Sequence, residues 1–173
     1  MSELAQLIKA AAYLEGEFVL RSGLISKYYL DKYLFATNAE ILEKLSDAFA
    51  AKIKKEYPEF DAIAAPELGA VAIAAAVSMK TQKNFVIVRK EQKDYGTSKQ
   101  VEGSLIGVKK VLMIEDILTT GGAAIKSADI LKRLGVEVIA ILGTIDRLQG
   151  AQKFIEEAGY KHDTLLTIKD LGI

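Results

Sequence analysis

Continuous apolar runs alternate along the chain with stretches whose apolar residues recur at helical spacing. The runs lie at residues 61–65, 85–88, 111–114 and 136–142, and a last strand and turn is expected within 160–171. Short apolar runs without polar interruption are typical of strands that are buried on both faces. The pattern therefore predicts a sheet whose strands lie inside the molecule.

Helices are expected between these runs. They should cover residues 2–14, a stretch from Asn38 to just before Pro58, a small-residue stretch that ends at Met79, and then 123–134 and 151–158. Ser2 and Asn38 are residue types that cap helix N-termini, because their side-chain oxygens accept hydrogen bonds from free backbone N–H groups. Their positions predict where the first and second helices begin.

Buried strands that alternate with helices imply an α/β fold, in which a parallel sheet is flanked by helices on both faces. Residues 16–31 differ, since two short strands around a Ser-Gly turn predict a hairpin. We expect residues 1–37 to form a small N-terminal hood beside the ligand-binding edge of the sheet. No repeat or linker divides the chain, so we expect a single domain over residues 1–173.

The most informative stretch joins the run at 111–114 to the helix at 123–134. Glu115 and Asp116 follow the strand, and two threonines and two glycines (119–122) stand at the mouth of the helix. Glycines let successive backbone N–H groups approach one anion, and a helix N-terminus adds partial positive charge. The stretch therefore predicts a phosphate-binding loop. The alternative is an ordinary strand-to-helix turn with exposed acids.

The two carboxylates need partners other than the phosphate, which they would repel. A ribose diol supplies hydrogen-bond donors, and Mg²⁺, which favours oxygen ligands and substrate phosphates, supplies positive charge. A Walker A loop fits less well because Lys126 follows Ile125 rather than glycine, and no G-x-G-x-x-G follows a strand-like run. We therefore expect a ribose 5-phosphate that is held at both ends.

Positive charge gathers in a long polar stretch at 89–103, which begins with Arg89, Lys90 and Lys93. Loops of this length are typical of functional lids, and these cations could converge on a polyanion. A solvated hairpin is the alternative. Residues 66–69 form another strand-loop-helix junction, which predicts either an anion site or close helix packing.

Two arginines could recognise an acidic ring. Arg147 follows the run at 136–142, where ligands bind in open α/β sheets, and a guanidinium can clamp a carboxylate there. Arg21 lies in the hairpin, with Phe18 and Tyr28 or Tyr29 available to flank a planar ring. A surface hairpin with an exposed arginine is the alternative for Arg21.

Composition limits the partners and the compartment. The chain holds 23 Lys plus Arg and 23 Asp plus Glu, so no general positive field would attract nucleic acid. It has no cysteine, which excludes disulfides and thiolate metal sites. Neither a basic leader nor an apolar stretch of membrane-spanning length is present. We expect a soluble cytoplasmic protein whose partners are small molecules.

Four segments of the chain resemble a known enzyme family. Residues 115–122, Glu-Asp-Ile-Leu-Thr-Thr-Gly-Gly, are similar to the phosphoribosyl pyrophosphate motif of the type I phosphoribosyltransferases. Three further segments resemble orotate phosphoribosyltransferases and occur in that family's order: Phe18-x-Leu20-x-Ser22-Gly23-x-x-Ser26-x-Tyr28-Tyr29-x-Asp31, Arg89-Lys90-x-x-Lys93-Asp94-Tyr95-Gly96 and Asp146-Arg147-x-x-Gly150. Their joint occurrence is far more specific than any one of them.

The resemblance implies transfer of ribose 5-phosphate from phosphoribosyl pyrophosphate to N1 of orotate, which gives orotidine 5′-phosphate and pyrophosphate in pyrimidine (UMP) biosynthesis. It implies Mg²⁺, held mainly by substrate and water, and a homodimer that shares lid residues. The implied residues for phosphoribosyl pyrophosphate are Arg89, Lys90, Lys93, Tyr95, Glu115, Asp116, Ile117, Leu118, Thr119, Thr120, Gly121, Gly122 and Ala123, with 66–69 along the pyrophosphate. Those for orotate are Arg21, Thr119 and Arg147, and those for catalysis are Lys93, Asp94, Glu115 and Asp116.

The chain departs from the family's pattern at three positions. Tyr95 stands where the lid usually has histidine, Ala65 stands where glycine usually precedes Pro66, and Arg21 replaces a frequent lysine. Two other functions stay open. One is a related transferase that acts on another base, and the other is a non-catalytic regulator that senses phosphoribosyl pyrophosphate. The regulator should show a basic face or an added DNA-binding element, and the balanced charge shows neither.

Overall fold

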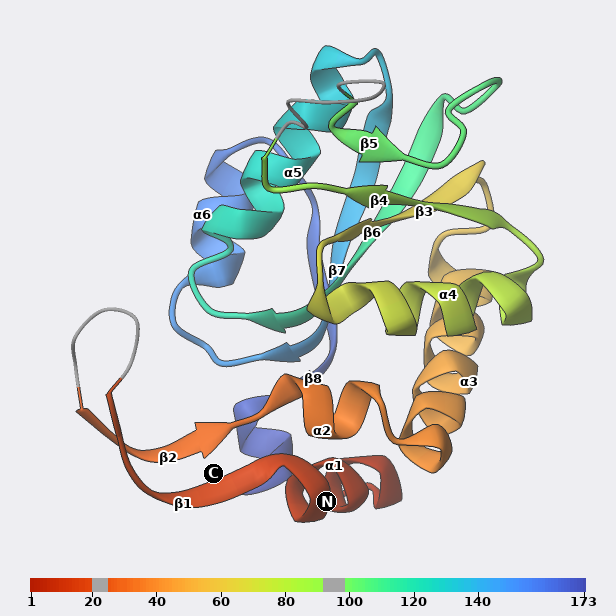
Figure 1. Ribbon diagram of the computed structural model, residues 1–173. Helices are drawn as coiled ribbons and strands as arrows, with labels where there is room; N and C mark the ends of the chain where they lie inside the picture. The colour runs from red at the N-terminus through yellow and green to blue at the C-terminus, as the bar shows by residue number, and fades with distance from the viewer. Residues whose placement is uncertain (20–24, 92–98) are drawn as a thin grey trace.

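The computed structural model describes residues 1–19, 25–91 and 99–173 of the chain (Figure 1). A six-stranded sheet in the order β5-β4-β3-β6-β7-β8 forms its centre, and all neighbouring strands are parallel except β4 and β5. The strands are β3 (Ala62–Pro66), β4 (Asn84–Val88), β5 (Val101–Glu102), β6 (Lys110–Leu118), β7 (Glu137–Asp146) and β8 (His162–Thr167). The α/β class with a parallel sheet flanked by helices is confirmed.

Helices cover both faces of the sheet. On one face lie α1 (Glu3–Ala12), α2 (Lys32–Ala36), α3 (Ala39–Glu56) and α4 (Gly69–Thr81), whose buried residues form one apolar cluster with Ile63, Leu112 and Leu142. On the other lie α5 (Gly122–Arg133) and α6 (Ala151–Glu157), packed on Val86, Val111 and Met113. In Figure 1, α5 and α6 appear to the left of the strands and α3 and α4 to the lower right. The core therefore has two layers, one on each side of the sheet.

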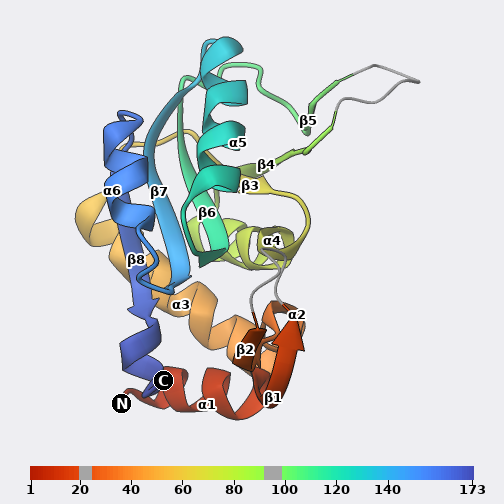
Figure 2. The ribbon, with the colours of Figure 1, turned by 90° about the vertical axis from the view of Figure 1, so that its left-hand side faces the viewer.

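The N-terminal hood consists of α1 and the antiparallel pair β1 (Tyr13–Val19) and β2 (Ile25–Leu30). Figure 2 shows it below the sheet and next to α2, with the two chain termini close together. Ala5, Ile8 and Ala12 of α1 are fully buried in the same apolar cluster as α3 and α4. The hood is therefore joined to the rest of the molecule by a shared apolar core.

The helix caps expected from the sequence are present. The Ser2 hydroxyl accepts from the N–H of Ala5 at 3.2 Å, and Asn38 Oδ1 accepts from the N–H of Ile41 at 3.1 Å. The first helix nevertheless ends at Ala12 rather than residue 14, because Tyr13 already pairs with Leu30 in the hairpin. Pairing with a neighbouring strand overrides the helical pattern there.

The central strand is longer than its apolar run. β6 continues to Leu118 because its last residues pair with β7, where Leu118 lies opposite Asp146. Glu115 and Asp116 therefore belong to the strand, which corrects the expectation that they lie in a loop. Carboxylates interrupt the apolar pattern, but they do not interrupt the backbone hydrogen bonds that define the strand. The phosphate-loop residues proper begin at Thr119.

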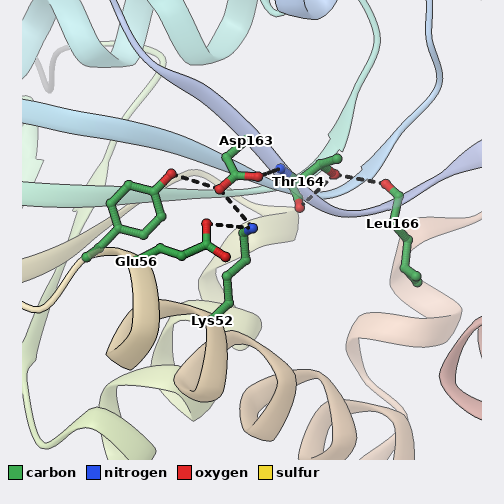
Figure 3. A network of polar contacts seen from close by, with 7 residues as sticks. Lys52, Glu56, Asp163, Thr164 and Leu166 are labelled. Atoms are coloured by element: carbon green, nitrogen blue, oxygen red, sulfur yellow. Dashed lines mark hydrogen bonds and ion pairs between the residues drawn. The ribbon is translucent and has the colours of Figure 1, made fainter.

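Polar contacts fix the edge strand β8 to α3 (Figure 3). Asp163 Oδ2 accepts from the Tyr57 hydroxyl at 2.8 Å and lies 2.9 Å from Lys52 Nζ, while its Oδ1 accepts from the N–H of Thr164 at 2.7 Å. Lys52 also pairs with Glu56 at 3.1 Å. Burial and the hydrogen bond to Asp163 both raise the pKa of the Tyr57 phenol. The network holds the last strand in place on the α3 side of the sheet.

None of the helices in the described part of the chain is both long and apolar enough to cross a membrane.

Candidate active site

The carboxyl ends of β3, β6 and β7 meet at one edge of the sheet, where a cavity of about 620 Å³ opens. Its wall contains one carboxylate, one arginine and the loop between β6 and α5. The lining residues are Glu115, Ile117, Leu118, Thr119, Thr120, Gly121, Gly122, Ala123, Ala124, Arg147 and Gln149. The structure therefore brings most of the expected phosphate-loop residues and Arg147 to one place.

The loop presents a helix N-terminus to this cavity. Gly121 caps α5 with a φ of 77°, a left-handed conformation that favours glycine. The first helical hydrogen bond runs from the N–H of Ile125 to the carbonyl of Gly121. The N–H groups of the preceding turn have no carbonyl partner within the helix, and the helix dipole adds positive potential there. This geometry is suited to a phosphate.

Gly121 is also required for packing. A Cβ atom at this position would lie 2.8 Å from Cγ1 of Ile155 in α6. Real carbon atoms do not approach so closely, so a side chain here would push the loop away from α6. The glycine thus fixes the position of the loop as well as its conformation.

Glu115 lies on the cavity side of β6 and is 8% exposed. Its Oε2 atom is buried without a hydrogen-bond partner among the described residues. Burial raises the pKa of this carboxyl to about 8, and the adjacent charge of Asp116 contributes to the increase. Burial therefore favours the protonated form of Glu115 in the free protein, and a ligand that donates hydrogen bonds to it would favour the charged form.

Asp116 points the opposite way, because successive side chains of a strand alternate between its faces. It is 2% exposed, and both of its oxygens have partners. Oδ1 accepts from the N–H of Ile117 at 2.6 Å, and Oδ2 lies 2.9 Å from the ammonium of Lys32 at the start of α2. The sequence led us to expect that Asp116 needs a partner from a ligand, but its cationic partner, Lys32, lies within the chain.

The junction of β3 and α4 lies against Asp116. A Cβ atom on Gly69 would overlap with Asp116 Oδ2 and would lie 3.0 Å from Cε of Lys32. Glu67 turns the other way: its Oε1 accepts from the N–H of Lys90 at 2.8 Å, and its Oε2 lies 4.0 Å from Arg89. The residues expected along a pyrophosphate are therefore joined both to the acidic strand and to the beginning of the expected lid.

Arg147 connects the cavity to the hood. Its Nη2 donates to the Tyr28 hydroxyl at 3.0 Å, and its guanidinium carbon lies 5.2 Å from the centre of the Tyr28 ring. Tyr28 in turn stacks on Tyr13 with ring centres 5.7 Å apart. Of the aromatic residues that the sequence offered as ring partners, Tyr28 is thus the one in contact with the arginine at the strand end. A planar acid could be recognised between such groups.

Four expected site residues, Arg21, Lys93, Asp94 and Tyr95, lie outside the described residues. Arg89 is described, and its guanidinium lies beside the carboxylates of Glu67 and Glu102. Sequence reasoning missed Lys32, which no motif contains. The only signal for it was indirect, since a buried aspartate at a strand end requires a cation or several donors.

A strand that carries two adjacent carboxylates and leads into a glycine-capped helix, at the edge of a parallel sheet with a hood, defines a phosphoribosyltransferase. The family model described as "Phosphoribosyl transferase domain" matches residues 36–158. Curated relatives indicate which phosphoribosyltransferases the chain resembles. The chain is 41% identical to an orotate phosphoribosyltransferase of Pyrococcus abyssi over 98% of this chain and 93% of that protein, and 39% identical to one of Methanocaldococcus jannaschii over 98% and 96%. The chain belongs to the orotate phosphoribosyltransferase family.

Solved structures agree with this assignment. The orotate phosphoribosyltransferase of Mycobacterium tuberculosis, solved with Fe(III) dicitrate, superposes with a TM-score of 0.87 at 27% identity and covers 99% of this chain and 98% of its own. The enzyme of Aeropyrum pernix superposes with a TM-score of 0.86 at 28% identity and covers 97% and 95%. The similarity therefore includes the hood as well as the sheet.

Proposed function

We propose that this chain transfers ribose 5-phosphate from phosphoribosyl pyrophosphate to N1 of orotate and releases pyrophosphate. The observation that carries the proposal is the cavity in which Glu115, the start of α5 and Arg147 meet, in a chain about 40% identical to curated orotate phosphoribosyltransferases. Each part of the cavity suits one part of the two substrates. The product would be orotidine 5′-phosphate.

The sugar phosphate would bind along the end of β6. The 5′-phosphate would accept hydrogen bonds from the loop at 119–123, where helix N–H groups are free of intrahelical partners. Glu115 and Asp116 would accept from the ribose hydroxyls at the end of β6. An ionised carboxylate accepts stronger hydrogen bonds than a neutral acid, so substrate binding should favour loss of the proton from Glu115.

The pyrophosphate would extend over residues 66–69 towards the lid. Arg89, Lys90, Lys93 and Tyr95 would contact it, and Lys93 and Asp94 would act in the catalytic step. Support comes from the contact between Glu67 and the N–H of Lys90, which joins the lid to the pyrophosphate loop. Orotate would lie between the hood and Arg147, with Arg21 and Thr119 as further contacts. Its carboxylate and carbonyls suit a guanidinium fork.

In the reaction the bond from C1 of the ribose to the pyrophosphate oxygen breaks, a bond from C1 to N1 of orotate forms, and the N1 proton of orotate passes to the leaving pyrophosphate or to water. Positive charge develops on the sugar and negative charge on the leaving group. The acidic pair would stabilise the sugar, and the cations of the lid would stabilise the pyrophosphate. Little covalent assistance from the protein is needed, because positioning and charge carry the step.

We further propose Mg²⁺ as the cofactor. In the part of the chain that the structure describes, no group of three or more acidic, histidine or cysteine side chains could hold a metal ion. The ion would therefore take most of its ligands from substrate oxygens and water, as Mg²⁺ often does at phosphate sites. The buried and unpartnered Oε2 of Glu115 fits this chemistry, since it can accept from a hydroxyl or a metal-bound water. Bound Mg²⁺ would neutralise charge on the pyrophosphate as it leaves.

We also propose a homodimer in which lid residues are shared between subunits, and a single domain over 1–173 to which the hood at 1–37 belongs. The first proposal follows from the family resemblance. The shared apolar core of α1, α3 and α4 supports the second.

The test is the fall in orotate absorbance on mixing the protein with phosphoribosyl pyrophosphate and Mg²⁺, with uracil, adenine and hypoxanthine as parallel acceptors. Loss of orotate alone is expected. Arg147→Ala should raise the KM for orotate by about tenfold or more, since it removes a charged hydrogen bond, whereas Arg133→Ala, at an exposed position on α5, should not. Turnover of another acceptor would indicate a related transferase. Binding of the donor without turnover would indicate a sensing protein.

A further inference from the structure

Three parts of the molecule that are distant in sequence meet at the Asp116 side chain. Lys32 comes from α2, which follows the hood hairpin, Asp116 comes from the end of β6, and Gly69 begins α4. The ammonium of Lys32 lies 2.9 Å from Asp116 Oδ2, and Gly69 leaves no room for even a methyl group beside that oxygen. The carboxylate is therefore confined on one side by backbone and held on the other by a cation.

The lysine itself is held in place. Asp31 caps α2 by accepting from the N–H of Tyr33 at 3.0 Å, which fixes the first turn that carries Lys32. The ammonium also lies 5.6 Å from the centre of the Tyr33 ring. Its position is thus set by local structure and not only by attraction to the aspartate.

Electrostatics favour the pair over either group alone. Burial alone would lower the pKa of Lys32, but the hydrogen bond and the charge of Asp116 outweigh it and raise that pKa above its ordinary value. An isolated aspartate that is 2% exposed would be costly to ionise. The neighbouring Glu115 would add a second negative charge. Lys32 therefore supplies the positive charge that partners the buried Asp116 carboxylate.

We propose that Lys32 is a positioning residue of the reaction: its ion pair holds the Asp116 carboxylate in one orientation at the end of β6, so that a remaining lone pair can accept a hydrogen bond from a ribose hydroxyl. The inference rests on the proposed function, because it assumes that Asp116 contacts the sugar. Lys32 also links the hood to the acidic strand, so the hood contributes to sugar binding through this contact.

The test compares binding of ribose 5-phosphate with binding of inorganic phosphate, by titration calorimetry at millimolar ligand. Both ligands can use the loop at 119–123, but only the first can use Asp116. Lys32→Met keeps a long side chain without charge, and Lys32→Arg keeps the charge. Lys44→Met is the matched control, since Lys44 also forms an ion pair at 2.9 Å, with Glu3, far from the cavity.

Lys32→Met should raise the Kd for ribose 5-phosphate by about tenfold or more, the size expected for loss of a hydrogen bond to a charged group. The Kd for inorganic phosphate should change by less than about twofold. The same variant should raise the KM for phosphoribosyl pyrophosphate much more than the KM for orotate. Lys32→Arg should recover most of the loss, and Lys44→Met should resemble the wild type. If Lys32→Met does not fold, Lys32→Gln replaces it.

Equal weakening of both ligands, or no weakening of ribose 5-phosphate, would overturn the role of Lys32 while wild-type turnover of orotate left the proposed function intact. Wild-type protein that binds neither ligand and turns over no orotate would overturn both.

Discussion

Replacement of Glu115 by glutamine should make the protein more stable at alkaline pH while it weakens the binding of phosphoribosyl pyrophosphate. Glu115 has a pKa of about 8 in the folded protein, compared with about 4.5 for an unperturbed glutamate. The folded state therefore binds more protons than the unfolded state between these two values. The contribution of Glu115 to the stability is therefore greatest below pH 4.5, falls as the pH rises through this window and changes little further above pH 8.

The size of the effect follows from the difference between the two pKa values. At about 1.4 kcal/mol per pH unit, the wild type should lose up to about 5 kcal/mol from this group between pH 4 and pH 9. Relaxation around the charged carboxylate would reduce this, so about 2–5 kcal/mol is expected. Glutamine at position 115 has no proton to lose, so the variant should escape that part of the pH dependence.

Urea unfolding at pH 5, 7 and 9 measures the difference. The free energy of unfolding of Glu115→Gln, relative to wild type, should increase steadily across the three pH values. Glu59→Gln, which removes one charge at an exposed position, should give a nearly constant difference. If the two variants show the same pH dependence, Glu115 is ionised in the free protein and the argument from burial is wrong.

Three further changes test other parts of the structure. Tyr28→Phe removes the hydroxyl that accepts from Arg147, so the KM for orotate should rise by a few fold in steady-state assays; an unchanged KM would place orotate elsewhere. Tyr57→Phe removes the hydrogen bond to Asp163 and should lower the free energy of unfolding in urea by about 1 kcal/mol at pH 7, without changing orotate turnover. Lys93→Ala should reduce turnover severely with little effect on orotate binding, because its partner would be the leaving group; full turnover would remove Lys93 from the mechanism.

Much of the fold could be predicted because its signals are local. The apolar runs identified β3, β4, β6 and β7, and the caps at Ser2 and Asn38 accept the hydrogen bonds that their residue types favour. Each of these features depends on residues only a few positions apart. Local propensity and pattern therefore decide them without knowledge of the rest of the chain.

Other elements could not be predicted because they depend on distant partners. β5 has only two residues, and it exists because it pairs antiparallel with β4. The helix α2 has only five residues, which is too short for a helical period to show in the sequence. Short elements of this kind gain little from intrinsic propensity and are stabilised by tertiary contacts.

The candidate site shows the same division. The phosphate loop and the acidic pair could be found from consecutive residues, and so could the need of those acids for donors or positive charge. The sequence predicted that ligands alone would supply these donors and charges. In the structure, Asp116 pairs with Lys32, a residue 84 positions earlier in the chain. No spacing rule connects two residues at that separation. Only the folded chain shows which of its lysines reaches the carboxylate.

The alternation of the strand explains why adjacent acids of the same charge can both be buried. Glu115 faces the cavity and α5, whereas Asp116 faces α2 and α4, so different surroundings act on each. Lys32 is the cationic partner of Asp116, whereas burial and the adjacent Asp116 raise the pKa of Glu115 and so favour its protonated form. The free site therefore carries less negative charge than two carboxylates would give, which reduces the repulsion of a substrate that carries phosphate at both ends. If Glu115 contacts the ribose as proposed, donors from the sugar would favour its charged form, so full negative charge would develop only where the bound sugar can use it.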